Sequence, residues 1–312
     1  MGDDRDQEQW LVERFEEFRP HLRSVAYRML GSLTEADDAV QDAWVRLSRA
    51  GVEGVDNLGG WLTTIVARIS LNMLRSRTTR KEDSLSFHVP DPVVTMQHHE
   101  PEDQALLADS VGLAMLVVLD TLSPAERLAF VLHDMFGLPF DEIAAMVDRS
   151  PEAARQLASR ARRRVRGAEP PLVDVDRARQ RQIVDAFLSA SRGGDFDALV
   201  DLLHPGIVLR IDAGARENAA ASMLIQGADA VAKQSRAGLR TILNLPTVDV
   251  QPVLVNGSAG VVVLRNGQPI SVMGFTISEG KITEIDSLAD PARMEGVVRA
   301  LKPGDIGKVR PR

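Results

Sequence analysis

No cysteine occurs in the 312 residues of this chain, which excludes disulfides, zinc fingers and thiol catalysis together. Such a composition suits a reducing compartment. Aromatic residues make up only 4% of the sequence, so platforms for stacking single-stranded nucleic acid are few. No apolar run approaches about 18 residues, and the acidic start MGDDRDQEQW is unlike a signal peptide. We therefore expect a cytoplasmic protein that does not enter a membrane.

What the chain does contain is enough apolar material for real cores. Hydrophobic residues make up 44% of the sequence and charged residues 26%, which is typical of globular domains. The length favours two or three domains. A formal net charge of −7 argues against a surface that coats nucleic acid everywhere, but it allows local basic faces.

Residues 10–80 carry the pattern of three helices. Apolar residues recur at three- and four-residue spacing through the first helix, which we expect to end at Gly31. Thr34 is predicted to cap the second helix. The glycine-rich stretch GVEGVDNLGG separates it from a third, which begins near Gly60.

A second helical pattern, between Leu122 and Arg166, predicts two helices joined by a tight turn. Ser123 and Glu126 have the spacing of a capping box. The stretch from Arg149 to Arg166 holds seven arginines and one acidic residue, against the acidic background of the chain. A helix-turn-helix whose second helix is basic is typical of proteins that read the DNA major groove.

Within that second helix the arginines divide into two groups. Arginine and glutamine are the usual readers of base edges, whereas other arginines contact phosphates. We predict phosphate contacts for Arg162, Arg164 and Arg166. One side of the helix carries the candidate base readers, which are Arg155, Gln156, Ser159, Arg160 and Arg163.

After Asp176 the pattern changes to two helices followed by strands. Asn256-Gly257, Asn266-Gly267 and Glu279-Gly280 have the sequence of hairpin turns. Helices followed by a curved antiparallel sheet indicate an α+β domain.

The order of these parts resembles a known family. The segments PHLRSVAYRMLGSLTEADDAVQDAWVRL and GGWLTTIVARISLNMLRSR resemble region 2 of the bacterial extracytoplasmic-function sigma factors. The segment from Leu122 to Val165 resembles their region 4. RQRQIVDAFLSASRGGDFDALVDLLHPGIVLRIDAGARE resembles the opening of a SnoaL-type domain, a cone-shaped fold similar to nuclear transport factor 2.

This resemblance implies a multidomain fold, with two all-α sigma domains, the second a helix-turn-helix, followed by an α+β cone-shaped SnoaL-like domain. The expected boundaries are region 2 at 8–80, a linker at 81–104, region 4 at 105–168, a linker at 169–176, the SnoaL-like domain at 177–301 and a tail at 302–312.

The resemblance also implies partners and sites. The partners are core RNA polymerase, through its β′ clamp and β flap, and promoter DNA. The residues implied for core binding are Asp37, Asp38, Gln41, Asp42 and Arg46. Those implied for the −10 element are Asn57, Trp61, Asn72, Arg75, Arg77, Arg80 and Lys81. Ser150 and Glu152 join the five base readers named above at the −35 element.

Sigma factors with this extension carry three motifs, WLPEP, DGGGK and NPDKL. The corresponding segments here are FHVPDP (87–92), DAGAR (212–216) and DPARM (290–294). In the family the extension replaces a separate anti-sigma protein and packs against region 2 and the linker. The residues we expect at such an interdomain regulatory contact are Pro90, Asp91, Pro92, Asp212, Arg216, Asp290 and Arg293.

Two other classes of function stay open at this point. One is an ordinary helix-turn-helix regulator with a ligand-sensing C-terminal domain, which has no need for the module at 10–80. The other is a SnoaL-like enzyme with a DNA-binding appendage, for which His204, Asp212 and Asp286 are the catalytic candidates. Because fold alone confers no chemistry, we expect no enzyme activity and no cofactor. We also expect no metal at His98-His99, and we leave open a small ligand of the C-terminal domain.

Overall fold

The computed structural model describes residues 3–50, 55–80, 88–96, 112–167, 176–214 and 222–299. They belong to two compact units. The first unit combines Met1–Ser84 with Val118–Glu169, and the second combines Leu85–Val117 with Pro170–Arg312. The first unit therefore holds both helical modules except for residues 113–117 at the start of the second module, which fall in the second unit. The segment around residue 90, which the sequence marks as a linker, folds with the C-terminal domain.

The first helical module consists of α1 (Asp3–Leu30), α2 (Leu33–Ala50) and α3 (Leu58–Arg80). Its core comes from apolar stripes that include Phe15, Leu22 and Val40, all at most 1% exposed. Gly31 ends α1 in a left-handed conformation, as predicted. The predicted cap of α2 is wrong, because Ser32 accepts the hydrogen bond from the amide of Glu35 at 3.4 Å and Thr34 lies within the helix.

The second helical module consists of α5 (Leu113–Asp120), α6 (Pro124–Phe130), the π-helical turn η1 (Val131–Met135), α7 (Phe140–Val147) and α8 (Pro151–Gly167). The capping box between Ser123 and Glu126 is present, which confirms the predicted start of α6. Asp148 takes a left-handed conformation at the end of α7, so that α8 can leave at a sharp angle. These elements form the expected helix-turn-helix.

The second unit is built on a mixed, mainly antiparallel sheet with strand order β1-β4-β5-β6-β7-β2-β3. Its strands are β1 (Val94–Thr95), β2 (Leu203–Asp212), β3 (Met223–Gln226), β4 (Val248–Val255), β5 (Ser258–Arg265), β6 (Gln268–Ser278) and β7 (Lys281–Leu288). Its helices are α9 (Arg177–Gly193), α10 (Phe196–Leu202), α11 (Ala228–Gln234), the π-helical turn η3 (Ser235–Leu239), α12 (Arg240–Leu243) and α13 (Pro291–Arg299). All pairs are antiparallel except β2 with β7.

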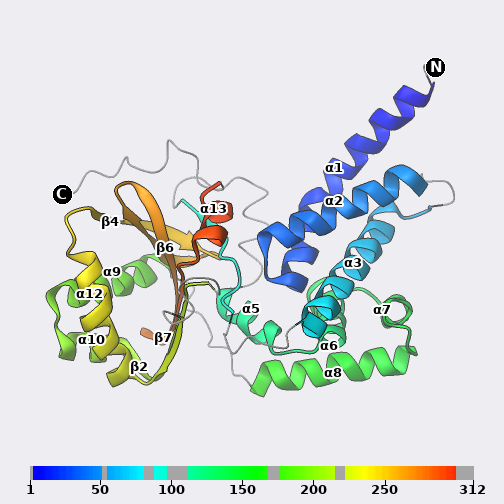
Figure 1. Cartoon of the computed structure of the whole chain (residues 1–312). Helices are drawn as coiled ribbons and strands as arrows, with labels where there is room; N and C mark the ends of the chain where they lie inside the picture. The colour runs from blue at the N-terminus through cyan, green and yellow to red at the C-terminus, as the bar shows by residue number, and fades with distance from the viewer. Residues whose placement is uncertain are drawn as a thin grey trace. The chain divides into compact units, whose positions relative to one another are not determined.

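Alternation along the strands gives this sheet two different faces. Ala259, Val261 and Val263 of β5 pack with Phe187 in one cluster of buried residues, together with Phe275 of β6. Figure 1 shows α9, α10 and α12 grouped on one side of the sheet. The three Asn-Gly and Glu-Gly turns are hairpins with positive φ at both residues, as predicted. The expected α+β architecture is confirmed.

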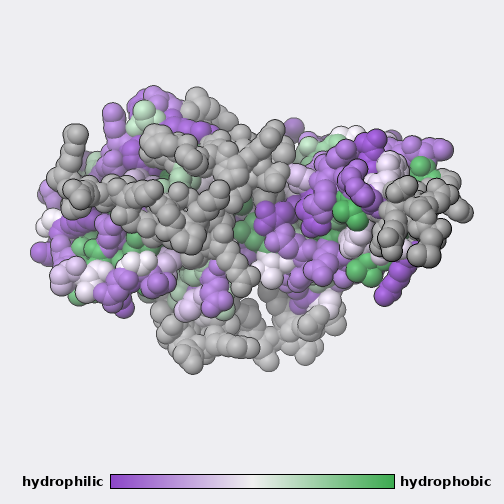
Figure 2. Space-filling view, turned by 90° about the horizontal axis from the view of Figure 1, so that it is seen from above, coloured by the Kyte–Doolittle hydropathy of each residue, from purple (hydrophilic) through white to green (hydrophobic). Residues whose placement is uncertain are grey.

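Hydrophobic residues on the described surface occur in small groups. On the face seen in Figure 2 the described atoms are mostly hydrophilic in both units. The large apolar side chains that are most exposed among the described residues include Trp10 and Val12 on α1 and Ile242 on α12. No helix in the described part of the chain has the length and apolar character needed to cross a membrane.

Close packing across the sheet gives a direct test of this fold. A Cβ at Gly260 would overlap the side chain of Val255 and lie 2.7 Å from the carbonyl oxygen of Met273. We expect Gly260→Ala to lower the free energy of unfolding by about 1–3 kcal/mol, because overpacking forces the backbone to move. Gly193→Ala, with no atom within 4 Å of its Cβ, is the matched control and should be neutral. Equal urea midpoints for the two variants would contradict this packing.

Candidate nucleic-acid interface and linker-binding site

The basic side of α8 faces solvent. Its opposite side packs on α6 and α7 through the buried residues Ala154, Ala158, Ala161 and Val165. All seven residues predicted for the −35 element are exposed: Ser150, Glu152, Arg155, Gln156, Ser159, Arg160 and Arg163. The guanidinium of Arg155 lies over the ring of Phe140, 5.3 Å from its centroid, and this contact orients it beside the turn.

Two of the arginines predicted to contact phosphates also form ion pairs with α6 and η1, which hold α8 in place. Arg164 pairs with Glu126 at 2.9 Å, and Arg162 pairs with Asp134 at 2.6 Å. Burial alone would raise the pKa of Glu126. The hydrogen bonds from Ser123 and the charges of Arg164 and Arg160 outweigh burial and lower that pKa below its ordinary value. One carboxylate thus caps α6 and anchors α8.

The acidic face of α2 is also exposed. The side chains predicted to bind core polymerase, Asp37, Asp38, Gln41, Asp42 and Arg46, all lie on it. Ala39, Val40 and Ala43 are buried on the other side of the helix. Asp37 is fixed by Arg23 of α1 through a 2.5 Å ion pair, so this face is displayed on a rigid helix pair.

The residues predicted for the −10 element lie in different environments. Asn57 accepts a hydrogen bond from the amide of Gly60 at 3.0 Å and so caps α3. Trp61 is half-buried, and Asn72 and Arg75 are exposed. Arg77 instead bridges two helices.

Arg77 is half-buried and pairs with Glu35 of α2, and it donates to the carbonyl oxygen of Leu30 at 3.0 Å. This geometry makes Arg77 a structural bridge between the helices. The side chain of Arg80 and the whole of Lys81 lie outside the described residues.

The two helical modules touch around a buried arginine that the sequence pattern did not single out. Arg28 of α1 is 5% exposed and lies over the ring of Phe136, 4.7 Å from its centroid. Its carbonyl oxygen accepts a hydrogen bond from Arg127 of α6 at 3.0 Å. Burial lowers the pKa of Arg28 to about 10. His21 lies edge-on to the same phenyl ring, 5.3 Å between centroids.

The segment at 89–95 is bound to the C-terminal domain by an ionic cluster, which we call the Arg293 clasp: Arg293, Asp91, Asp212 and the backbone of Val89. Nε of Arg293 donates to Asp91 at 2.6 Å, and Nη1 donates to Asp212 at 2.8 Å. A third hydrogen bond from Arg293 goes to the carbonyl oxygen of Val89. The amide of Val89 donates to Asp212 at 3.1 Å.

Strand pairing continues where the clasp ends. The amide of Val93 donates to the side chain of Asn256 at 3.0 Å, and the amide of Asn256 donates back to the carbonyl oxygen of Val93 at 2.8 Å. β1 then pairs antiparallel with β4 as the edge strand of the sheet. Every residue from 89 to 95, Pro90 and Pro92 included, is buried. A segment with the composition of a solvated linker is thus part of a folded domain.

Two further residues of the predicted motifs, Asp290 and Gly214, shape the backbone next to the clasp. Asp290 accepts the amide of Ala292 at 2.9 Å and so caps α13, the helix that carries Arg293. Gly214 has a φ of +84°, and a Cβ there would lie 2.8 Å from the Asp290 carboxylate, so only glycine fits. Arg216 lies outside the described residues.

The structure does not bring the three catalytic candidates together. Asp212 serves the clasp. His204 is exposed in β2, where its Nδ1 accepts the amide of Gly206 at 3.1 Å. Asp286 pairs with Arg210 at 2.9 Å. Its neighbours Ile285 and Ser287 line a cavity of about 260 Å³, so alternation turns Asp286 away from it.

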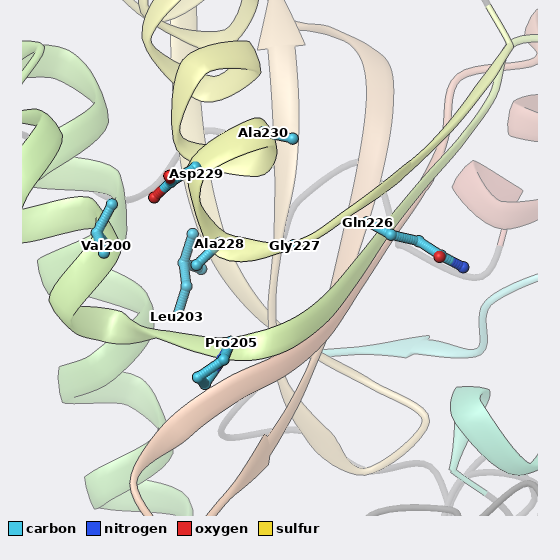
Figure 3. A pocket seen from close by; sticks show the side chains of 8 residues that line it. All are labelled: Val200, Leu203, Pro205, Gln226, Gly227, Ala228, Asp229 and Ala230. Atoms are coloured by element: carbon cyan, nitrogen blue, oxygen red, sulfur yellow. The ribbon is translucent and has the colours of Figure 1, made fainter.

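A second, more open hollow lies at the start of α11. Figure 3 shows Leu203, Pro205 and Ala228 gathered around it, with the side chain of Gln226 apart from them. Among the described residues, no group of three or more His, Cys, Asp or Glu side chains is arranged to hold a metal ion. His98 and His99 lie outside the described residues.

The ion pair at Asp286 makes the stability of the second unit depend on pH. Asp286 is 2% exposed and shares the guanidinium of Arg210 with Glu284, so one of two carboxylates lacks full compensation. Burial raises the pKa of Asp286 to about 6. A raised folded-state pKa stabilises the protonated fold below about pH 4, and this contribution is lost as pH rises through 6.

We therefore expect the free energy of unfolding of the wild type to fall relative to Asp286→Asn between pH 4 and pH 7. The loss should reach up to about 3 kcal/mol. Urea unfolding of both proteins across this range measures it, because all other titrations cancel in the difference. A difference that stays constant with pH would show that Asp286 keeps an ordinary pKa.

Comparison with known proteins agrees with this geometry. Residues 14–80 match the family model for sigma-70 region 2, and residues 113–165 match that for sigma-70 region 4. The probable ECF RNA polymerase sigma factor SigI of Mycobacterium tuberculosis is 36% identical over 281 residues, covering 89% of this chain and 92% of the relative. The ECF RNA polymerase sigma factor SigJ of the same species is 35% identical over 302 residues, covering 91% and 93%.

The crystal structure of Mycobacterium tuberculosis SigJ superposes with a TM-score of 0.71 at 32% identity, covering 91% of this chain and 98% of that one. The match runs through both helical modules and the C-terminal domain. It leaves no place for a reading of the chain as an ordinary helix-turn-helix regulator. The chain belongs to the extracytoplasmic-function sigma factors, the subunits that direct bacterial RNA polymerase to particular promoters.

Proposed function

We propose that this sigma factor is regulated in cis, by a C-terminal domain that holds the connection between its two helical modules. The observation that carries the proposal is the burial of residues 89–95 in the second unit, with Arg293 bridging Asp91 and Asp212. The half-buried Arg293 lies between two nearly buried carboxylates, which would have no counter-charge without it. We infer that the connection is held while this ionic bridge is intact and is released when the bridge breaks.

The spacing of the promoter elements explains why holding the connection would reduce activity. The −10 and −35 elements are roughly 25 base pairs apart, which is about 85 Å along B-DNA. A unit of the size of the first one has a radius of gyration of about 14 Å. Helices α3 and α8 thus cannot reach both elements while their modules pack together. Activity requires the modules to separate, and a held connection opposes that.

The contact between the modules is suited to opening. Among the described residues no acidic side chain pairs with Arg28, although it is buried, and its Nε has no acceptor. The lowered pKa of Arg28 reports the cost of that burial. Separation would return this guanidinium to water.

The exposed faces divide the partners between them. We assign the acidic face of α2 to the β′ clamp of core polymerase, α8 and its module to the −35 element and the β flap, and α3 to the −10 element. Asn72 and Arg75 are the exposed candidates on α3. Such an activity belongs in the cytoplasm, where RNA polymerase works.

We also propose that the C-terminal domain is regulatory and not catalytic. His204, Asp212 and Asp286 point to three different places. Among the described residues that line the 260 Å³ cavity, none is an acid, a base or a nucleophile stronger than serine. General acid–base catalysis needs a titratable group within reach of the substrate.

The exposed arginines of α8 should carry promoter recognition. We expect Arg155→Ala, Arg160→Ala and Arg163→Ala each to reduce transcription from −35-dependent promoters about 5- to 100-fold, the cost of one lost base or phosphate contact. Arg192→Ala is the matched control, because this exposed arginine lies on α9, outside the helix-turn-helix, and its effect should stay within about 2-fold.

The readout is run-off transcription with purified core polymerase on a library of promoter fragments. Sequencing the transcripts gives the start sites, and with them the promoters that each variant still uses. Equal losses for all four variants would contradict the assignment of the exposed face.

Breaking the clasp should release the sigma factor. Arg293→Gln leaves Asp91 and Asp212 without the cation between them, which weakens the clasp by about 3 kcal/mol, and Asp91→Asn removes the ion pair that ties the connection to Arg293. We expect both variants to raise run-off transcription several-fold over the full-length wild type. The exposed Arg265 provides the control Arg265→Gln, which should change nothing.

A truncation ending at Val173 separates this effect from loss of the domain as a whole. If Arg293→Gln and Asp91→Asn lower transcription, the domain activates and the proposed sign is wrong. If they leave transcription unchanged while circular dichroism shows an intact fold, the clasp is not regulatory.

A further inference from the structure

The cavity in the C-terminal domain lies against the two strands that support the Arg293 clasp. It is walled by β2, β5, β6 and β7 on one side and roofed by the segment from Gln234 to Ile242 on the other. Ile211 of β2 and Ser287 of β7 are register partners in its wall. Its volume is about 260 Å³.

We propose that this cavity binds a neutral, mostly apolar small molecule with one hydroxyl or carbonyl group, and that binding strengthens the Arg293 clasp. The coupling to transcription rests on the function proposed above. The binding itself does not.

The chemistry of the wall selects the class of ligand. None of the described residues that line the cavity is charged, so a charged ligand would leave its ion unpaired in an apolar site. The hydroxyls of Ser271 and Ser287 lie 2.9 Å apart and provide a polar point in the sheet wall, whereas the polar residues Gln234 and Ser235 belong to the roof. Since the two oxygens share one hydrogen, the other O–H remains to donate to a ligand. One polar group on an otherwise apolar body fits this wall.

The volume sets the size of the ligand. An apolar cavity of about 150 Å³ holds benzene, and ligand pockets begin near 300 Å³. The occupant therefore has about 10 to 14 non-hydrogen atoms. Ile242, an exposed apolar side chain, and Leu239 lie on the roof, where η3 interrupts the regular helix. π-Helical turns often occur at functional sites, and this one marks the side of entry.

Strand geometry connects the cavity to the clasp. In β2, Ile211 faces the cavity and the next residue, Asp212, faces Arg293 and Val89. Just after β7, Ala289 lines the cavity while its amide donates to the carbonyl oxygen of Asp212 at 2.7 Å. A ligand that packs on these residues fixes the backbone that aims the Asp212 carboxylate. By thermodynamic reciprocity, breaking the clasp must lower the affinity of the cavity for the ligand.

The binding test uses 1-naphthol as the probe, a neutral bicyclic phenol of the inferred size, titrated calorimetrically into the full-length chain. Naphthalene lacks the hydroxyl, and 1-naphthoate carries a charge. We expect 1-naphthol to bind at least 10-fold more tightly than 1-naphthoate. Replacing both Ser271 and Ser287 by alanine should lower the affinity for 1-naphthol about 5-fold, which is the usual effect of losing one hydrogen bond. The affinity for naphthalene should not change.

Two substitutions locate the binding. Ile270→Trp fills the cavity wall and should abolish binding, whereas Arg265→Trp, on the same hairpin but outside the cavity, should not. Gly238→Leu, placed in the roof, is a second blocking variant should Ile270→Trp not fold. Absence of 1-naphthol binding at millimolar concentration, equal binding of 1-naphthoate, or full binding by a folded blocking variant would overturn the site.

The coupling has its own measurement. Arg293 does not line the cavity, yet Arg293→Gln should lower the affinity for 1-naphthol several-fold. An unchanged affinity would overturn the coupling and leave the site standing. Because these titrations contain no polymerase, their outcome is independent of whether breaking the clasp changes transcription.

Discussion

The second unit's hold on residues 89–95 depends on the ionic bridge made by the half-buried guanidinium of Arg293. It joins Asp91, from the connection between the helical modules, to Asp212 at the end of β2. Loss of the cation would leave two nearly buried carboxylates side by side without a counter-charge. Asp290 caps α13, the helix that carries Arg293, and Gly214 allows the close approach of the Asp290 carboxylate, so both residues help to maintain this geometry.

Under the proposed function, this ionic bridge gives the fused third domain a direct hold on the connection between the helical modules. A separate inhibitor must find its target, whereas a domain on the same chain acts at a high effective concentration. The strand pairing of β1 with β4 adds backbone hydrogen bonds that do not depend on side-chain identity. The clasp makes the side-chain-specific contacts, and the strand pairing extends the contact along the rest of the segment.

Much of the fold follows from local signals, and the sites follow less well. The capping box at Ser123 and Glu126, the left-handed glycine after α1 and the asparagine-glycine hairpins are encoded within a few residues, so the sequence predicts them. Alternation and helical spacing also predict which faces of α2 and α8 are exposed. The role of Arg77 was not predictable, because its partner Glu35 lies far away in the sequence. The roles of Arg28 and Asn256 were not predictable either, because their partners come from other elements. The burial of the proline-rich segment was also not predictable, because it depends on pairing with the edge of a distant sheet.

The central claim is that residues 89–95 are held by the C-terminal domain in the free protein and released when the sigma factor works. Amide hydrogen exchange, read by mass spectrometry on peptides that cover this segment, tests it most directly. We predict strong protection of Val93 and its neighbours in the free chain, and loss of that protection in the complex with core polymerase and promoter DNA. Rapid exchange in the free chain, or unchanged protection in the transcribing complex, would contradict the account.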